Sequence, residues 1–139
     1  MTDLWPDAEL GEMVTDGEVL SFEAEAPITK GSPVYLTDDM KVSPSPGGDN
    51  AIGIALNSPI AGEHCSVCTR GVVKVTASGA ITRGTAVCSA AGGKVSQLVD
   101  QAVDEGGSAT YTIFYVRKLG IAYQTTTTDG DEFLIHVEK

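Results

Sequence analysis

The sequence predicts an all-β protein, a compact barrel or sandwich built from an internally duplicated unit. Residues 17–36 align without a gap on residues 70–89, at an offset of 53 positions, with identities such as Val19/Val72 and Gly31/Gly84. Within both segments apolar and polar residues alternate, which is typical of half-buried strands. Glycine, proline and polar turn signals recur roughly every 8 to 12 residues, the spacing of all-β sandwiches and barrels.

Each copy predicts the same series of elements, beginning with an alternating strand. In the second copy this strand places Val73, Val75 and Ala77 on one face and Lys74 and Thr76 on the other. The motif I-T-[KR]-G-[ST]-x-V follows in both copies, and its glycine permits a tight turn between strands.

A hairpin and two further strands complete each copy. The hairpin joins a short strand, residues 34–36 or 86–88, through a polar turn to a strand that begins with Lys-Val-Ser. A small-residue Gly-Ile-Ala strand comes next, and the closing strand covers residues 65–69 or 132–137. The Gly-Ile-Ala segments are 67 positions apart, which indicates an insertion near residues 97–115 of the second copy.

The insertion is the one place where the sequence predicts a helix. Leu98, Val99, Ala102 and Val103 are spaced i, i+1, i+4, i+5, which suits a short amphipathic helix near 97–105 that ends at Gly106-Gly107. The run ATYTIFYV, residues 109–116, is rich in aromatic and β-branched residues and predicts a strand.

These patterns predict an N-terminal arm and a single β domain. Residues 1–16 lie outside the repeat and contain the only tryptophan, Trp5, so we interpret them as an arm. The β domain covers residues 17–139, with the first copy at 17–69 and the second at 70–139.

The charge of the chain excludes some partners. Nineteen acidic residues against nine basic residues give a net charge of −10, and no cluster of lysine and arginine offsets it. Such a chain repels nucleic acid phosphate, so direct nucleic acid binding is disfavoured. No apolar run approaches the roughly 20 residues that cross a membrane, and the start MTDLWPDAEL lacks the features of a secretory signal. We therefore expect no membrane partner and synthesis in a cytoplasm.

Cysteine and histidine offer the main chemical alternatives to a structural role. Cys65 and Cys68 have the CxxC spacing of metal and redox sites and follow His64, but a second ligand pair is missing and the segment alternates like a strand. His64 and His136 fall at equivalent places in the two closing strands, where surface histidines are common. A small enzyme that uses these residues stays an alternative, whereas buried, inert cysteines are the simpler interpretation.

Two further motifs look chemical but fit poorly. Gly93-Lys94 is followed by Val95, whereas a phosphate-binding P-loop needs Ser or Thr there and an earlier glycine at a fixed spacing. Acidic clusters occur at three places, but none matches a calcium-binding loop, and hairpin tips are commonly acidic: Asp38-Asp39, Asp104-Glu105 and Asp129-Gly-Asp131-Glu132. We expect no catalytic residue, no metal site and no cofactor.

The repeat unit resembles the small decoration, or cement, proteins of tailed-virus heads. The resemblance lies in the stretch from EAPITKGSPVYL to TRGVVKV, where a turn, a short hairpin and a Gly-Ile-Ala strand recur in the same order. It covers nearly everything from Gly17 to Lys139. The lambda-type head decoration protein and the phage family known as DUF2190 are both similar, and the duplication with the closing DGDEFLIHVE fits the second better.

The resemblance implies a β-tulip-like barrel that assembles as a homotrimer on the outside of the mature capsid. Its partner would be the major capsid protein, its location the exterior of the virion, and its role the stabilisation of the head. By analogy with the arm of lambda-type relatives, Leu4, Trp5 and Pro6 are candidates for capsid or subunit contact. A carbohydrate- or host-surface-binding β module is the alternative, for which exposed aromatic residues would be expected.

Overall fold

The computed structural model describes residues 8–14, 17–47, 50–98, 101–105, 108–112 and 118–138, and every regular element among them is a strand. The prediction of an all-β fold is confirmed. The strands are β1 (Glu18–Ala24), β2 (Pro33–Asp38), β3 (Lys41–Pro44), β4 (Ala51–Ala55), β5 (His64–Thr76), β6 (Ala86–Ala90), β7 (Lys94–Gln97), β8 (Gln101–Glu105), β9 (Ser108–Thr112), β10 (Gly120–Ala122) and β11 (Glu132–Glu138). None of the described residues forms a helix that could span a membrane.

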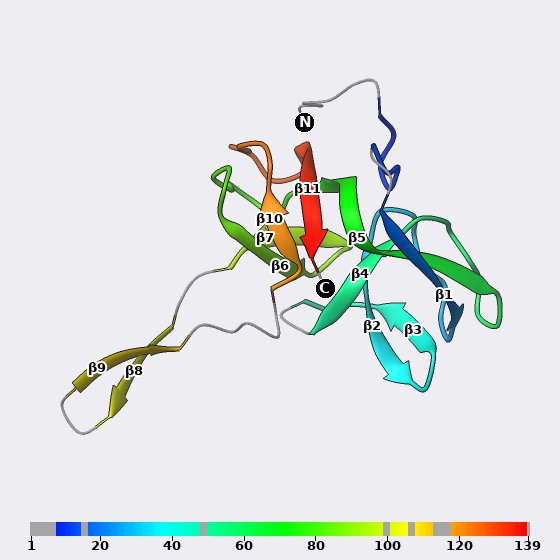
Figure 1. Ribbon diagram of the computed structural model, residues 1–139, viewed down its shortest axis with the longest axis horizontal. Coiled ribbons are helices and arrows are strands. Elements are labelled where there is room, and N and C mark those ends of the chain that lie inside the picture. The colour runs from blue at the N-terminus through cyan, green and yellow to red at the C-terminus, as the bar shows by residue number, and fades with distance from the viewer. Residues whose placement is uncertain are drawn as a thin grey trace.

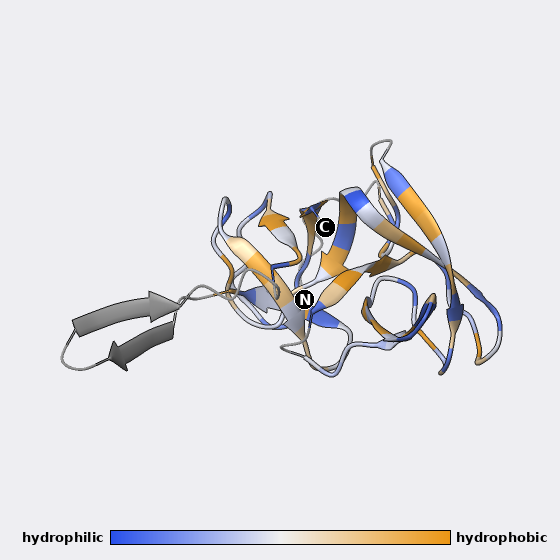
Figure 2. Cartoon of the chain, turned by 60° about the horizontal axis from the view of Figure 1, so that its bottom comes forward, coloured by the Kyte–Doolittle hydropathy of each residue, from blue (hydrophilic) through white to orange (hydrophobic). Residues whose placement is uncertain are grey.

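Five strands close into a barrel at one end of the molecule, which we call barrel one. They follow the order β1-β3-β2-β4-β5, and β1 also pairs with β5, so the circuit is complete. Figure 1 shows β1, β2, β3 and β4 grouped together, with the long strand β5 leading away from them. Apolar and polar segments alternate along the strands, as Figure 2 shows, because successive residues face opposite sides.

The second half of β5 starts a second circuit, which we call barrel two. It runs β5-β11-β10-β6-β7, and a parallel bridge between Ala77 and Val95 brings β7 back to the end of β5. The bridge repeats the pairing of Ala24 with Val42 that joins β1 to β3 in barrel one. Strand β5 has 13 residues and serves both barrels, with Gly71 at a φ of 138° near its centre.

Equivalent backbone hydrogen bonds occur in the two barrels, which also have the same strand order. The Gly31 N–H donates to the Ala55 carbonyl at 2.8 Å, and at the equivalent place the Gly84 N–H donates to Ala122 at 2.7 Å. The I-T-[KR]-G turn therefore ties the start of each hairpin to the end of the Gly-Ile-Ala strand. These repeated contacts explain why the turn glycine occurs in both copies of the sequence.

The glycine of each Gly-Ile-Ala strand lies against the backbone of the closing strand. A Cβ atom at Gly53 would lie 2.2 Å from the Cys68 carbonyl oxygen, and one at Gly120 would lie 2.0 Å from that of His136. Real Cβ atoms do not approach a carbonyl so closely, so only glycine fits at either position.

The interiors of the two barrels contain the same positions filled in different ways. In barrel one the large Phe22 on β1 faces the small Cys65 on β5, whereas in barrel two the small Val75 on β5 faces the large Phe133 on β11. All four side chains are buried. Each barrel thus places one phenylalanine against one smaller residue at this pair of positions. The phenylalanine lies on the first strand of barrel one but on the closing strand of barrel two.

The predicted helix near 97–105 is wrong. Gln101–Glu105 is strand β8, which pairs antiparallel with β9 in a separate two-stranded sheet, and Glu105 faces Ser108 next to the turn. The helix end predicted at Gly106-Gly107 lies outside the described residues, and two runs joined by Gly-Gly are a known hairpin signal in a sequence. The strand predicted over 109–116 is confirmed for its first part, while residues 113–117 lie outside the described residues.

The N-terminal segment of residues 8–14 lies along the second half of β5. Val14 N–H donates to the Val72 carbonyl at 2.9 Å, and the Gly11 N–H donates to the Lys74 carbonyl at 2.9 Å. The Lys74 Nζ donates to the Ala8 carbonyl at 2.8 Å. Lys74 lies on the polar face of the alternating strand and is nevertheless buried, because this segment covers it.

Candidate functional site

The two cysteines of the CxxC segment face different interiors. Cys65 packs in the core of barrel one with Phe22 and Val67, whereas Cys68 belongs to the cluster that contains Val73 and Ile135. Residues three apart on a strand lie on opposite faces, so the spacing that suits a metal ligand pair in a loop separates the two thiols here.

Burial also makes both thiols poor nucleophiles and poor ligands. It raises the pKa of the Cys65 thiol above its usual value and raises the pKa of the Cys68 thiol to about 11. The thiolate is the reactive and metal-binding form, so these cysteines are protonated at neutral pH. Among the described residues, no three His, Cys, Asp or Glu side chains lie close enough to hold a metal ion.

His64 lies on the surface of barrel one between two serines. Its Nδ1 bonds the Ser21 hydroxyl, and its Nε2 lies 2.8 Å from the Ser66 hydroxyl. In a catalytic triad one ring nitrogen bonds a carboxylate that orients the base. Both ring nitrogens of His64 are instead occupied by hydroxyl groups, so the geometry does not form a triad.

His136 is not the structural equivalent of His64, contrary to the sequence prediction. His64 faces Glu23 across β1 and β5, and in barrel two the corresponding register position, opposite Thr76, is Glu132. The closing strands are therefore offset by one residue more than the Gly-Ile-Ala strands. His136 Nδ1 lies 3.0 Å from the Glu138 carboxylate, and its ring lies 5.7 Å from that of Tyr123.

The Gly-Gly-Lys segment is the tip of the β6–β7 hairpin. The hairpin pairs Ala90 with Lys94 around a three-residue turn, and Lys94 Nζ lies 3.0 Å from the Asp129 carboxylate. Asp131 is buried and accepts hydrogen bonds at 3.2 Å from the N–H groups of Thr127 and Thr128. Asp129 and Asp131 therefore stabilise the loop before β11. The side chains of Asp104 and Glu105 are not among those that the structure describes.

Exposed apolar side chains concentrate on barrel one and make it the candidate binding surface. In the described part of the chain, six large apolar residues are highly exposed, and all but Tyr123 belong to this barrel. The five are Val19, Leu20, Leu36, Met40 and Ile60. We call Val19 and Leu20 on β1, together with Leu36 and Met40 on the β2–β3 hairpin, the barrel-one patch. Patches of this kind mark interaction sites more often than scattered apolar residues do.

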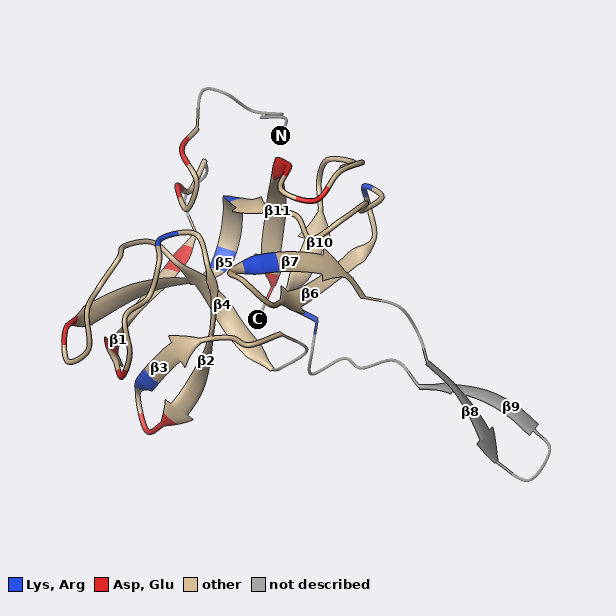
Figure 3. Cartoon of the chain, turned by 180° about the vertical axis from the view of Figure 1, so that it is seen from behind, with Lys and Arg blue, Asp and Glu red and all other residues tan. Residues whose placement is uncertain are grey.

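A shallow groove of about 600 Å³ lies between β1 and the β2–β3 hairpin, at the Leu36 and Met40 end of the barrel-one patch. Its apolar lining comes from Phe22, Leu36 and Met40, and its rim includes Asp38 and Asp39. Figure 3 shows acidic residues at the tip of the β2–β3 hairpin, beside the basic start of β3, where Lys41 pairs with Glu23 at 3.5 Å. The surface combines an apolar centre with a negatively charged rim, which suits an apolar partner segment that carries positive charge.

Sequence reasoning missed this patch and placed its candidates elsewhere. Leu4, Trp5 and Pro6, the predicted contact residues, lie outside the described residues. The one signal for the patch is the adjacent apolar pair Val19-Leu20, which breaks the alternation of β1. An alternating strand has a single apolar face, so such a pair indicates that both faces of β1 meet a partner.

Comparison with known proteins gives a consistent result. The family model described as phage cement protein matches residues 14–138. The crystal structure of the N base of head fiber gp8.5 in bacteriophage phi29 is similar in fold, with a TM-score of 0.57 at 13% sequence identity. The similarity covers 87% of this chain and 93% of that chain. A comparison with curated proteins finds no match.

Proposed function

The chain belongs to the phage cement protein family, and from this premise we propose that it decorates the outer surface of the mature head and stabilises it. Membership makes it a structural component of the virion that is associated with the capsid. The finer proposal is that its partner is the major capsid protein, that it acts as a homotrimer and that it catalyses no reaction. The family match over residues 14–138 is the observation that carries the proposal.

The stabilisation follows from mass action. A protein that binds the expanded lattice and not its dissociated subunits lowers the free energy of the lattice by RT ln(1 + [L]/Kd) per site. The net charge of −10 supports a position outside the shell, where the protein does not compete for packaged nucleic acid. The barrel-one patch and the proposed arm contacts Leu4, Trp5 and Pro6 would supply the binding energy.

No observation favours the alternatives. The buried, protonated thiols and the hydroxyl-bound His64 do not support a small enzyme. Among the described residues, Tyr123 is the one aromatic side chain in the exposed apolar set, which gives little support to a carbohydrate-binding face.

The proposal is tested by binding of the purified protein to expanded heads that lack it. We expect the protein to cosediment with expanded heads but not with unexpanded proheads, and to raise the temperature at which the expanded heads open. Trp5→Ala should weaken binding without changing the melting temperature of the free protein. The mass in solution should be three times the 14.4 kDa of the chain. Equal thermal stability of heads with and without the protein would refute the proposal.

A further inference from the structure

The internal duplication allows one edge of β1 to be compared with the same edge of β5. At the offset of 53 positions, Val19, Leu20 and Ser21 of barrel one correspond to Val72, Val73 and Lys74 of barrel two. The two trios pair in the same register with their closing strands, since Leu20 faces Val67 and Val73 faces Ile135. Any difference between the two edges therefore reflects what covers them and not how they are built.

In barrel two the chain itself covers this edge with an added strand. Residues 11–14 run antiparallel to β5, with Met13 bridged to Val73. Three backbone hydrogen bonds join them, one on Val72 and two on Lys74. Val73 is fully buried in the core cluster against which Met13 packs, and Val72 is 9% exposed.

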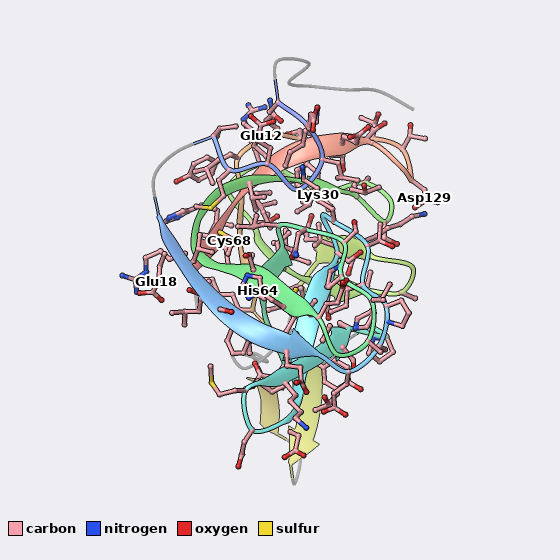
Figure 4. All side chains as sticks on the ribbon, turned by 90° about the vertical axis from the view of Figure 1, so that its right-hand side faces the viewer. Glu12, Glu18, Lys30, His64, Cys68 and Asp129 are labelled. Carbon is pink, nitrogen blue, oxygen red and sulfur yellow. The ribbon has the colours of Figure 1, made fainter. Side chains whose placement is uncertain are left out.

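In barrel one the same edge is open. Strand β3 reaches only Glu23 and Ala24 of β1, and among the described residues no strand pairs with Val19–Ser21 on the side away from β5. Val19 is 46% exposed and Leu20 is 45% exposed. Figure 4 shows β1 at the surface facing the viewer, with Glu18 at its start.

The backbone of Ser21 points its hydrogen-bonding groups out of this edge. Glu23 N–H donates to the Met40 carbonyl on the β3 side, whereas Ala24 N–H donates to the Glu63 carbonyl on the β5 side. Because these directions alternate along a strand, the Ser21 N–H and C=O face away from β5. Unpaired edge groups beside exposed apolar side chains form a template for another strand.

We propose that the edge Val19–Ser21 binds an extended segment of a capsid subunit, which adds a strand to barrel one as residues 11–14 add one to barrel two. Backbone hydrogen bonds to Ser21 would hold the segment, and Val19 and Leu20 would contact its apolar side chains. This inference rests on the proposed function, because it names the surface through which the decoration protein meets the capsid.

Charge selects the occupant. Strand β1, EVLSFEA, contains no basic residue, and its Glu23 already pairs with Lys41 of β3 at 3.5 Å. Glu18 is the β1 carboxylate outside that ion pair, so the added segment should carry lysine or arginine near Glu18, beside its apolar centre. A second copy of this chain is a poorer occupant. Its covering segment is already paired with its own β5 and contains Glu9 and Glu12, which would add negative charge to an acidic edge.

The test compares Ser21→Pro with Ser21→Ala in binding to expanded heads. Proline removes the outward N–H and is tolerated on an edge strand, whereas alanine retains the N–H and loses only the hydroxyl that bonds His64. We expect Ser21→Ala to bind like the wild type and Ser21→Pro to bind about tenfold or more weakly. Binding of the two variants within twofold of each other would overturn the inference.

Hydrogen exchange of the wild-type protein gives a second readout that does not depend on a variant folding. The Ser21 N–H should exchange rapidly in the free protein and more than tenfold more slowly on expanded heads, in line with strand addition. Unchanged exchange on heads that carry bound protein would overturn the strand addition but leave the proposed function intact. Protection that instead rises with the concentration of the free protein would assign the edge to a second copy. Failure of the wild type to bind heads would overturn both.

Discussion

Barrels one and two share a backbone register, yet the chain covers the outer edge of one and leaves that of the other open. Val73 in barrel two is fully buried and bridged by Met13, while its counterpart Leu20 in barrel one is 45% exposed. Because the fold is duplicated, the paired edge of β5 shows how the open edge of β1 would look with a strand added to it. The difference indicates that barrel two is the structural half of the molecule and barrel one the half available to a partner.

The largest expected effect concerns the packing that the two barrels share. Phe133→Ala empties the core of barrel two and should lower the free energy of unfolding by about 3 to 5 kcal/mol, because a fully buried aromatic side chain leaves a cavity. Denaturant unfolding followed by fluorescence measures this loss.

A double variant sharpens the comparison of the cores. Val75→Phe combined with Phe133→Cys copies into barrel two the arrangement of Phe22 and Cys65. Because the pair keeps one phenylalanine and exchanges a valine for the slightly smaller cysteine, the double variant should unfold within about 1.5 kcal/mol of the wild type. A loss as large as that of Phe133→Ala would show that the two interiors are not interchangeable.

The next effect concerns the covered and open edges directly. Val73→Ala should lower the free energy of unfolding by about 2 kcal/mol, because it removes buried methyl groups. Leu20→Ala removes a larger side chain at the matching position but should cost less than about 1 kcal/mol, since the leucine is already half exposed. Thermal unfolding of the two variants side by side measures the two losses of unfolding free energy. An equal or larger cost for Leu20→Ala would mean that the edge of β1 is covered in the free protein.

The sequence predicted those features of the fold that recur at a fixed offset. Val34 pairs with Gly53 in barrel one, and Val87 pairs with Gly120 in barrel two. These residues recur in the sequence because the same backbone contacts are made once in each barrel. Features that occur once were harder to predict. The helix predicted near 97–105 was wrong because residues four apart lie on the same face of a strand as well as of a helix. The burial of Lys74 could not be predicted because it depends on a segment more than sixty residues away.

The candidate surface could not be predicted for a related physical reason. Alternation in a strand indicates which face is apolar, but it does not indicate whether another segment pairs with the strand's edge. Met13 bridges the edge of β5 at Val73, whereas no described strand pairs with the matching edge of β1 at Leu20. By contrast, the failure of Cys65 and Cys68 as a metal pair was foreseeable from their odd separation on a strand.

The smallest expected effect concerns the tips of the two hairpins. Met40 has a φ of 55°, whereas its counterpart Gly93 has a φ of 76°. A side chain in this left-handed region costs about 1 to 2 kcal/mol, and glycine avoids this cost but loses about 0.5 to 1 kcal/mol through the entropy of the unfolded chain. Met40→Gly should therefore stabilise the free protein by about 0.5 to 1 kcal/mol, a gain that chemical denaturation can resolve.

The reverse exchange explains why the tips differ. A Cβ at Gly93 would lie 2.7 Å from the Ser32 hydroxyl oxygen, so Gly93→Met should destabilise the protein by more than the cost of the dihedral angle alone. Met40 is 59% exposed and lines the groove of the barrel-one patch. Strain of this kind persists where the side chain serves a partner. Met40→Gly should accordingly weaken binding to expanded heads while raising the stability of the free protein, and unchanged binding would remove Met40 from the interface.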